Sequence, residues 1–232
     1  MTQLILELPH LPALGRDDFL VADSNAEAAA LIDGYPNWSQ PVKALVGPKA
    51  SGKSHLAAVW GLKAQAQTHA ACRLEESMLT ALMDAPALLI DDLDAITSAQ
   101  ETILFHLYNH AVHTGKGLLL CARTPLSKLP VALPDLVSRL SAVETAELKP
   151  PCDSLMNAVL VKLFHDRQIR VGERVISYIV PRMERSFEGL NKLVDGIDHA
   201  SLVGKKAVTI PLISSVLKDL EASENHINAG QG

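Results

Sequence analysis

Residues 47–54 have the composition and spacing of a phosphate-binding loop. They read Gly-Pro-Lys-Ala-Ser-Gly-Lys-Ser, with a glycine at each end of the loop and a lysine and a hydroxyl residue after it. The glycines let successive backbone N–H groups point at a phosphate, Lys53 is expected to contact the β- and γ-phosphates, and Ser54 is expected to hold Mg²⁺. The pattern predicts binding of ADP or ATP with Mg²⁺. The predicted nucleotide-binding residues are Gly47, Pro48, Lys49, Ala50, Ser51, Gly52, Lys53, Ser54 and His55.

A second candidate site feature is the apolar run of residues 87–90, which ends in Asp91 and Asp92. Such a run is typical of a buried parallel strand whose carboxyl end opens on a site. Paired with a phosphate loop, it predicts that Asp91 orders the Mg²⁺ ligands and that Asp92 orients or activates the attacking water. The alternative is a strand that ends in an ordinary turn.

Both features need particular elements around them. The loop follows a short apolar run, residues 44–46, and precedes a segment with Leu56, Val59 and Trp60 at helical spacing. A strand before and a helix after are the context that a phosphate-binding loop requires.

Further along, strands and helices alternate, which predicts a three-layer α/β domain with a parallel sheet over residues 16–150. Ser24 or Asn25 is expected to cap a helix that ends at Asp33. The other expected elements are a strand at 71–74, a helix at 75–83, a helix at 98–114, a strand at 117–122, a proline-rich loop at 124–134, a helix at 135–140 and a strand at 141–145.

After residue 151 the pattern becomes helical. Apolar residues recur at helical spacing in four segments, which predicts a small all-helical domain over residues 151–221, followed by a polar tail at 222–232. The expected helices are residues 153–168, 172–183, 186–203 and 210–220.

Composition limits the possible functions. The chain has 232 residues, 48% of them hydrophobic, and a formal net charge of −5. Without clustered lysines and arginines, this charge argues against a large DNA-binding surface, so we expect no direct sequence-specific DNA binding. The sequence has neither a membrane-spanning run nor a signal peptide, which predicts a cytoplasmic protein without membrane contact.

Cysteines and histidines form no clear metal-binding pattern. The three cysteines are widely separated and lack C-x-x-C spacing, so we expect buried, reduced thiols at Cys72, Cys121 and Cys152. Three histidines at i, i+4 and i+7 can share one helix face, but no carboxylate or thiol lies at ligand spacing beside them. We therefore favour a packed helix over a metal site for His106, His110 and His113.

The first fifteen residues lie outside the expected core. Residues 3–8 are largely apolar, and Pro9 and Pro12 end any regular structure. The segment is either an edge strand or loosely packed tail, or an extended peptide that places Gln3, Leu6 and Leu8 into pockets of a partner.

Five segments give the chain a family resemblance. Together they span about residues 16–220 and are residues 19–28, 47–56, 88–92, 105–109 and 135–140. With these segments the chain resembles the AAA+ ATPases and, within them, the DnaA/Hda family of bacterial replication proteins. The resemblance implies an AAA+ nucleotide-binding domain followed by a helical lid. The initiator DnaA continues into a helix-turn-helix domain and this chain does not, so we expect a regulatory member.

The resemblance also implies a function. Regulatory members bind the sliding clamp, the β subunit of DNA polymerase III, and stimulate hydrolysis of ATP held by DnaA, which prevents over-initiation. It assigns Arg139 as an arginine finger acting in trans, for which the alternative is a structural salt bridge at a helix end. A homodimer remains possible. The segment that the resemblance assigns to clamp binding contains Gln3, Leu4, Leu6 and Leu8.

Two departures from the family bear on catalysis by the chain itself. Ala122 stands at the sensor-1 position, where the initiator has an acidic residue, and Glu188 stands near the sensor-2 position, where the family has an arginine. A carboxylate there repels a γ-phosphate, although Arg185 is a possible substitute. These residues predict weak or absent ATPase activity and favour a diphosphate.

Two other classes of function remain open. A stand-alone AAA+ ATPase of the helicase-loader type would turn over its own ATP without an initiator. A small-molecule kinase would need an arginine-rich lid and an acceptor pocket, and Glu188 and the apolar lid helices argue against it.

Overall fold

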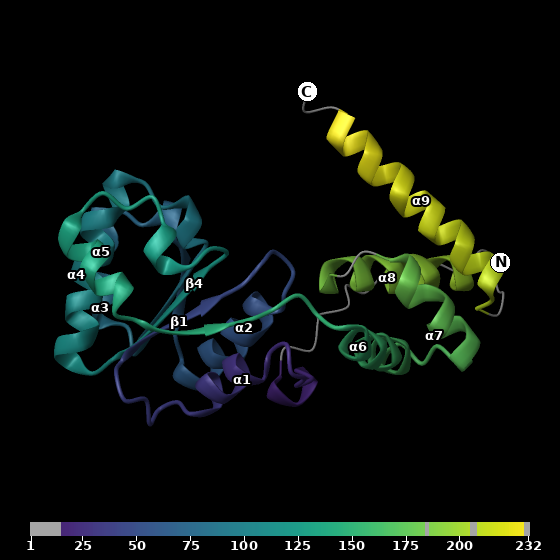
Figure 1. Cartoon of the computed structure of the whole chain (residues 1–232), viewed down its shortest axis with the longest axis horizontal. Coiled ribbons are helices and arrows are strands. Elements are labelled where there is room, and N and C mark those ends of the chain that lie inside the picture. The colour runs from purple at the N-terminus through teal and green to yellow at the C-terminus, as the bar shows by residue number, and fades with distance from the viewer. Residues whose placement is uncertain (1–14, 184–185, 205–207, 230–232) are drawn as a thin grey trace, which may run out of the picture.

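A five-stranded parallel sheet lies at the centre of the first part of the chain (Figure 1). The computed structural model describes residues 15–183, 186–204 and 208–229. The strand order is β2-β3-β4-β1-β5, and every neighbouring pair is parallel. The register aligns the carboxyl ends of the central strands, since Val46 lies opposite Ala122 and Ile90 lies opposite Leu120. The strands are β1 (Val42–Val46), β2 (Gln67–Ala70), β3 (Ala87–Asp91), β4 (Gly117–Ala122) and β5 (Glu144–Glu147).

Helices cover both faces of this sheet, which confirms the predicted three-layer α/β architecture. One face carries α1 (Ala26–Asp33) and α2 (Lys53–Ala64). The other face carries α3 (Leu79–Asp84), α4 (Ser98–Thr114) and α5 (Pro134–Ser141).

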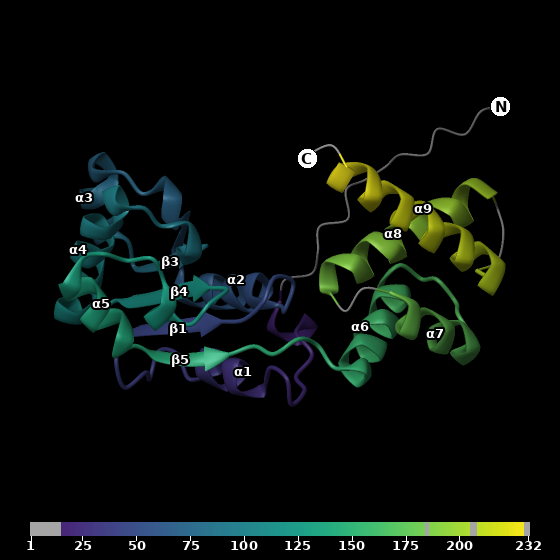
Figure 2. The ribbon, with the colours of Figure 1, turned by 45° about the horizontal axis from the view of Figure 1, so that its top comes forward.

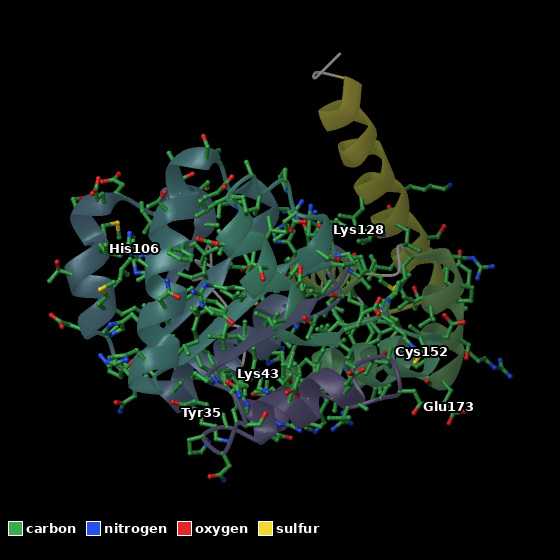
Figure 3. The ribbon with its side chains drawn as sticks, turned by 60° about the vertical axis from the view of Figure 1, so that its left-hand side comes forward. Tyr35, Lys43, His106, Lys128, Cys152 and Glu173 are labelled. Atoms are coloured by element: carbon green, nitrogen blue, oxygen red, sulfur yellow. The ribbon has the colours of Figure 1, made fainter. Side chains whose placement is uncertain are left out.

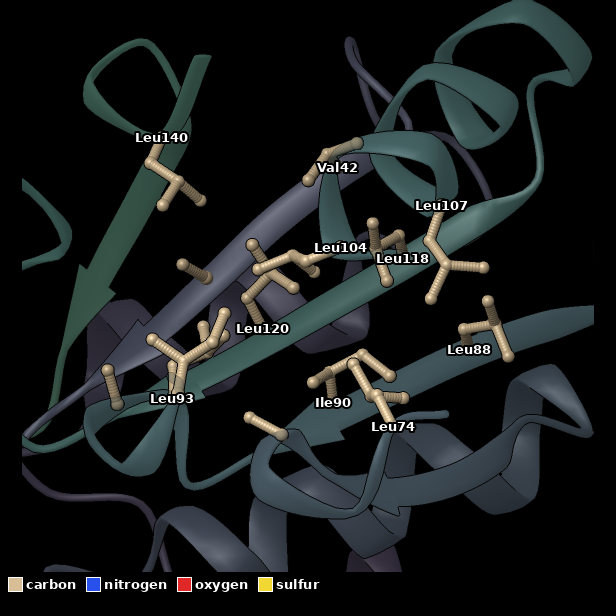
Figure 4. Packing of buried hydrophobic residues seen from close by; sticks show 14 of the residues in the cluster. Val42, Leu74, Leu88, Ile90, Leu93, Leu104, Leu107, Leu118, Leu120 and Leu140 are labelled. Atoms are coloured by element: carbon tan, nitrogen blue, oxygen red, sulfur yellow. The ribbon is translucent and has the colours of Figure 1, made fainter. Parts of the chain in front are cut away.

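Alternation along the strands divides the core between the two faces. Leu118 and Leu120 of β4 pack toward α4, where they join Leu104 and Leu107 (Figure 4). Leu119 lies between them in sequence and belongs to the cluster under α1 and α2. This period of two is what a strand buried on both faces produces.

The second part of the chain is a helical domain with its own core (Figure 2). Buried side chains from three of its helices include Phe164, Leu193 and Ile213. The four helices confirm the predicted lid, and they are α6 (Asp153–Asp166), α7 (Glu173–Ile179), α8 (Phe187–Gly204) and α9 (Ile210–Ala229).

Several predicted boundaries differ from the structure. The edge strand β2 is Gln67–Ala70, not residues 71–74, because Ala71 begins a 3-10 turn whose alanine is fully buried in the core. The helix expected at 75–83 is a 3-10 turn, Glu76–Met78, followed by α3. At the other end of the sheet, α5 continues to Ser141, and this moves the start of β5 to Glu144.

The last helix also differs from the prediction, because α9 extends to Ala229 rather than ending at Leu220. The additional residues are mostly alanine, glutamate, serine and asparagine, and none of them is a proline or glycine that would stop a helix. Polar composition alone therefore does not mark the helix end.

The cysteine prediction is only partly confirmed. Cys121 is buried in β4, Cys72 is exposed, and Cys152, on the lid side in Figure 3, is half-buried. Cys72 follows the edge strand in a surface turn, which explains its exposure. Within the described ranges, no helix has the length and apolarity of a membrane span, and no group of three or more His, Cys, Asp or Glu residues is placed to hold a metal ion.

Candidate functional site

The phosphate-binding loop connects β1 to α2 at the carboxyl edge of the sheet, and two glycines make its path possible. A Cβ atom on residue 47 would lie 2.3 Å from the carbonyl oxygen of Leu148. Gly52 has a φ of 96°, in the left-handed region that disfavours a side chain. The backbone can therefore curl back against the sheet only with glycine at both positions.

Lys53 lies at the centre of this loop. Its side chain is buried, and Nζ donates hydrogen bonds to the carbonyl oxygens of Gly47, at 2.5 Å, and Pro48, at 2.8 Å. Burial of the ammonium group lowers the pKa of Lys53, and the nearby carboxylates of Asp91 and Asp94 oppose this effect. The loop thus surrounds a cation that is positioned to neutralise a phosphate.

Two side chains at the loop carry buried polar atoms with no hydrogen-bond partner among the described residues. They are Oγ of Ser51 and Nε2 of His55. An unpartnered buried polar atom is costly, so such atoms fit a site whose ligand supplies the missing oxygen or nitrogen. Ser54 is exposed in the first turn of α2 and is free to approach a cation. These residues fit the phosphates of a nucleotide and its Mg²⁺.

The acidic end of β3 lies next to this loop, but its second carboxylate is already paired. Asp91 accepts the backbone N–H of Asp92 at 2.8 Å, and Asp92 adopts a left-handed φ of 54°. One carboxylate oxygen of Asp92 accepts a hydrogen bond from the Arg123 guanidinium at 3.0 Å. This ion pair competes with any role of Asp92 as a base for water.

Arg123 is a site residue that the sequence analysis missed. It directly follows Ala122, the last residue of β4, and its backbone N–H donates to Asp94 at 2.6 Å. Burial alone would raise the pKa of Asp94, but the hydrogen bonds from Arg123 and Thr124 hold that pKa below its usual value. Its place at the end of an apolar strand was the signal in the sequence that could have identified Arg123.

The lid reaches the phosphate-binding loop through the start of α8. The backbone N–H of Phe187 donates to the carbonyl oxygen of Ala50 at 3.5 Å, and its ring lies 3.2 Å from where a Cβ on Gly52 would be. Glu188 lies at the loop as the sequence suggested, but it is flanked by Lys192 at 2.9 Å and Lys49 at 3.6 Å.

Those two lysines change the electrostatics expected of Glu188. A hydrogen bond from Lys192, together with the charges of Lys192 and Lys49, lowers the pKa of Glu188. The carboxylate is thus ionised and at the same time partly neutralised, so its repulsion of a phosphate is weaker than for an isolated acid. Arg185, the possible substitute, lies outside the described residues.

Arg139 occupies a different region of the domain. The carbon of its guanidinium lies 5.0 Å from the ring centroid of Phe105 and 5.6 Å from that of Tyr108, both on α4. Within the described part of the chain it forms no ion pair, so the salt bridge considered as the alternative is not observed there. The helix α5 ends shortly before the start of β5 and lies toward the amino edge of the sheet (Figure 2), so Arg139, in its last turn, is on that side. The chain's own phosphate-binding loop is at the opposite, carboxyl edge.

A phosphate-binding loop, an acidic β3 end and a helical lid on a parallel sheet together define an AAA+ type of nucleotide-binding protein. Residues 153–217 match the family model described as the Hda lid domain. Residues 153–217 thus carry an Hda-type lid, and the chain as a whole has a DnaA-like AAA+ fold.

Several solved structures share this fold. Domain III of the replication initiation protein DnaA from Thermotoga maritima has a TM-score of 0.77 at 20% identity, with coverage of 91% of this chain and 98% of that one. AMPPCP-bound DnaA from Aquifex aeolicus has a TM-score of 0.72 at 16% identity, with coverage of 84% and 68%. A Thermotoga maritima RuvB variant has a TM-score of 0.70 at 15% identity, with coverage of 89% and 72%. At these identities the likeness concerns the fold alone.

Proposed function

We propose that this chain is a DnaA-related regulator of replication initiation, which binds the DNA polymerase III sliding clamp and stimulates hydrolysis of the ATP held by DnaA. Inactivation of DnaA after hydrolysis would prevent over-initiation. The Hda-type lid and the DnaA-like AAA+ fold support a role in this system.

The observation that carries the proposal is the environment of Arg139. Its guanidinium rests on two aromatic rings, forms no ion pair among the described residues and lies away from the chain's own phosphate-binding loop. A guanidinium in this arrangement is available to contact the phosphates of a nucleotide bound to another protein. An arginine finger in trans accelerates phosphoryl transfer by about 10³ to 10⁵ in the systems where its effect is known.

In this proposal the chain's own nucleotide has a structural role. ADP or ATP would bind residues 47–55, with Mg²⁺ held through Ser54 and Asp91. Hydrolysis by the chain itself would be slow because Asp92 is paired with Arg123 and Ala122 offers no polar group at the sensor-1 position. Glu188 still carries a negative charge near the loop, although Lys49 and Lys192 partly neutralise it, and this charge gives a modest preference for a diphosphate over a triphosphate.

Clamp binding is assigned to the segment that contains Gln3, Leu4, Leu6 and Leu8, which lies outside the described residues. An extended peptide with one polar side chain and several leucines can bind weakly to a pocket on the clamp. Because the clamp is a ring with several equivalent pockets, multivalent binding strengthens this contact. The protein would act in the cytoplasm, without binding DNA sequence-specifically, as a monomer or a homodimer.

The test is ATP hydrolysis by purified DnaA in the presence of clamp loaded on DNA. Adding the chain should accelerate hydrolysis of DnaA-bound ATP, and the acceleration should depend on the clamp. A complete phosphate-binding loop also favours the alternative, a stand-alone ATPase of the helicase-loader type. Steady turnover of ATP by the isolated chain, with no effect on DnaA, would support that alternative and refute the proposal.

A further inference from the structure

One face of α4 contacts both ends of α5. Glu101, Phe105 and Tyr108 are spaced four and three residues apart on α4, and such residues are neighbours on one side of a helix. Glu101 contacts the backbone just before α5, and the two aromatic rings contact Arg139 near its end.

Glu101 determines where α5 begins. It is 5% exposed, and its carboxylate oxygens accept the N–H of Ala132, at 3.1 Å, and the N–H of Leu133, at 2.7 Å. Leu133 is the N-cap residue of α5, so its position sets the start of the helix. Hydrogen bonds to a carboxylate are stronger than those between neutral groups, and losing them is costly for a carboxylate that is buried.

The other contacts fix the rotation of α5 and the direction of its arginine. Leu136 and Leu140 are buried in the core beneath the helix. With the start and the buried side of α5 both fixed, the guanidinium of Arg139 lies over the rings of Phe105 and Tyr108. A guanidinium that stacks on an aromatic ring contacts the ring through its flat face, so its N–H groups stay available to another partner.

We propose that Glu101 and Tyr108 are positioning residues for Arg139, which hold its guanidinium in a fixed orientation before DnaA is bound. This inference rests on the proposed function, in which Arg139 acts on ATP held by DnaA. A side chain already held in one orientation loses less conformational freedom when it enters the partner's site. The two residues thereby raise the rate of hydrolysis without touching the nucleotide.

The test measures the rate of hydrolysis of DnaA-bound ATP against the concentration of the full chain, with clamp on DNA. Tyr108→Leu should lower the maximal rate about two- to thirty-fold, the range that corresponds to loss of one cation–π contact. The chain concentration that gives half the maximal rate should not change. Tyr108→Phe keeps the ring and should retain a rate close to that of the wild type.

A matched control exists in the lid, where the guanidinium of Arg182 lies 4.1 Å from the ring centroid of Tyr178. Tyr178→Leu removes a comparable contact far from α5 and should leave the maximal rate unchanged. Glu101→Gln should also lower the maximal rate, because a neutral amide oxygen binds the N–H groups of Ala132 and Leu133 more weakly than the carboxylate does, and the amide nitrogen accepts no hydrogen bond. If Glu101→Gln does not fold, the Tyr108 pair still decides the matter.

Three results would overturn the inference. They are an unchanged maximal rate for Tyr108→Leu, whatever its half-saturating concentration, an equal loss of maximal rate in Tyr108→Phe, and an equal loss in Tyr178→Leu. Arg139→Ala, measured in parallel, separates this inference from the proposed function. If Arg139→Ala loses the stimulation while Tyr108→Leu keeps it, only the positioning role is wrong, whereas full stimulation by Arg139→Ala refutes the finger itself.

Discussion

Replacing Lys53 with alanine should remove nucleotide-dependent stabilisation while the chain still folds. In the wild type, a ligand that binds only the folded state at one hundred times its Kd stabilises that state by about 2.7 kcal/mol. For a chain of this size, each kcal/mol shifts the melting temperature by about 2 to 4 °C. Magnesium ADP at that excess should therefore raise Tm of the wild type by roughly 5 to 11 °C.

Without nucleotide, the same substitution should have a much smaller effect on stability. The lysine donates two hydrogen bonds to the loop, at 2.5 and 2.8 Å, and their loss is unfavourable. Removal of a buried ammonium, whose pKa is lowered by burial, offsets part of that loss. We expect a net change on the order of 1 kcal/mol, which is below the effect of bound nucleotide.

The assay is thermal unfolding with and without magnesium ADP, together with direct titration of the nucleotide. Lys63→Ala is the matched control, because Lys63 lies at the far end of the same helix and donates one hydrogen bond to the backbone of Asp33, at 3.0 Å. That variant should keep the full shift in Tm. If Lys53→Ala keeps it as well, the assignment of the phosphate site is wrong.

Two further predictions concern the N-terminal segment, residues 1–15, and the pH dependence of stability. Replacing Gln3, Leu6 and Leu8 with alanine should abolish clamp binding in a calorimetric titration while nucleotide affinity and circular dichroism stay the same, and wild-type clamp affinity would refute the tail assignment. Burial lowers the pKa of His55 from its ordinary value of 6.5, so the unfolded chain takes up this proton first and stability is lost as pH falls below about 6.5. The free energy of unfolding, measured in urea between pH 7.5 and 5, should therefore fall less steeply in His55→Gln than in the wild type. The difference in slope should be up to about 1.4 kcal/mol per pH unit. The exposed His165 offers the control, and a slope for His55→Gln equal to those of His165→Gln and the wild type would contradict the prediction.

Elements with strong local signals were predictable from the sequence. The bounds of α4, Ser98–Thr114, match the prediction because Thr97 and Gln100 form a capping box and Gly115 ends the helix with a positive φ. The strand β4 also matches, since a run of apolar residues buried on both faces has no competing pattern. The edge strand β2 was misplaced because its polar, partly exposed residues lack that pattern.

The pairings within the site could not be predicted, because each one joins residues far apart in the sequence. Asp92 meets Arg123 only through the pairing of β3 with β4, and Lys49 meets Glu188 only because the lid packs on the loop. The spacing around Arg139 allowed a salt bridge, and only the packing of α5 on α4 shows that aromatic rings surround its guanidinium instead.

The central claim is tested most directly by the single-turnover rate at which DnaA hydrolyses its bound ATP, with clamp on DNA and either the wild-type chain or Arg139→Ala. The variant should fold and bind magnesium ADP and the clamp as the wild type does, because Arg139 lies in neither proposed site. We predict that the rate with Arg139→Ala falls to that of DnaA without the chain. A rate near that of the wild-type chain would contradict the account.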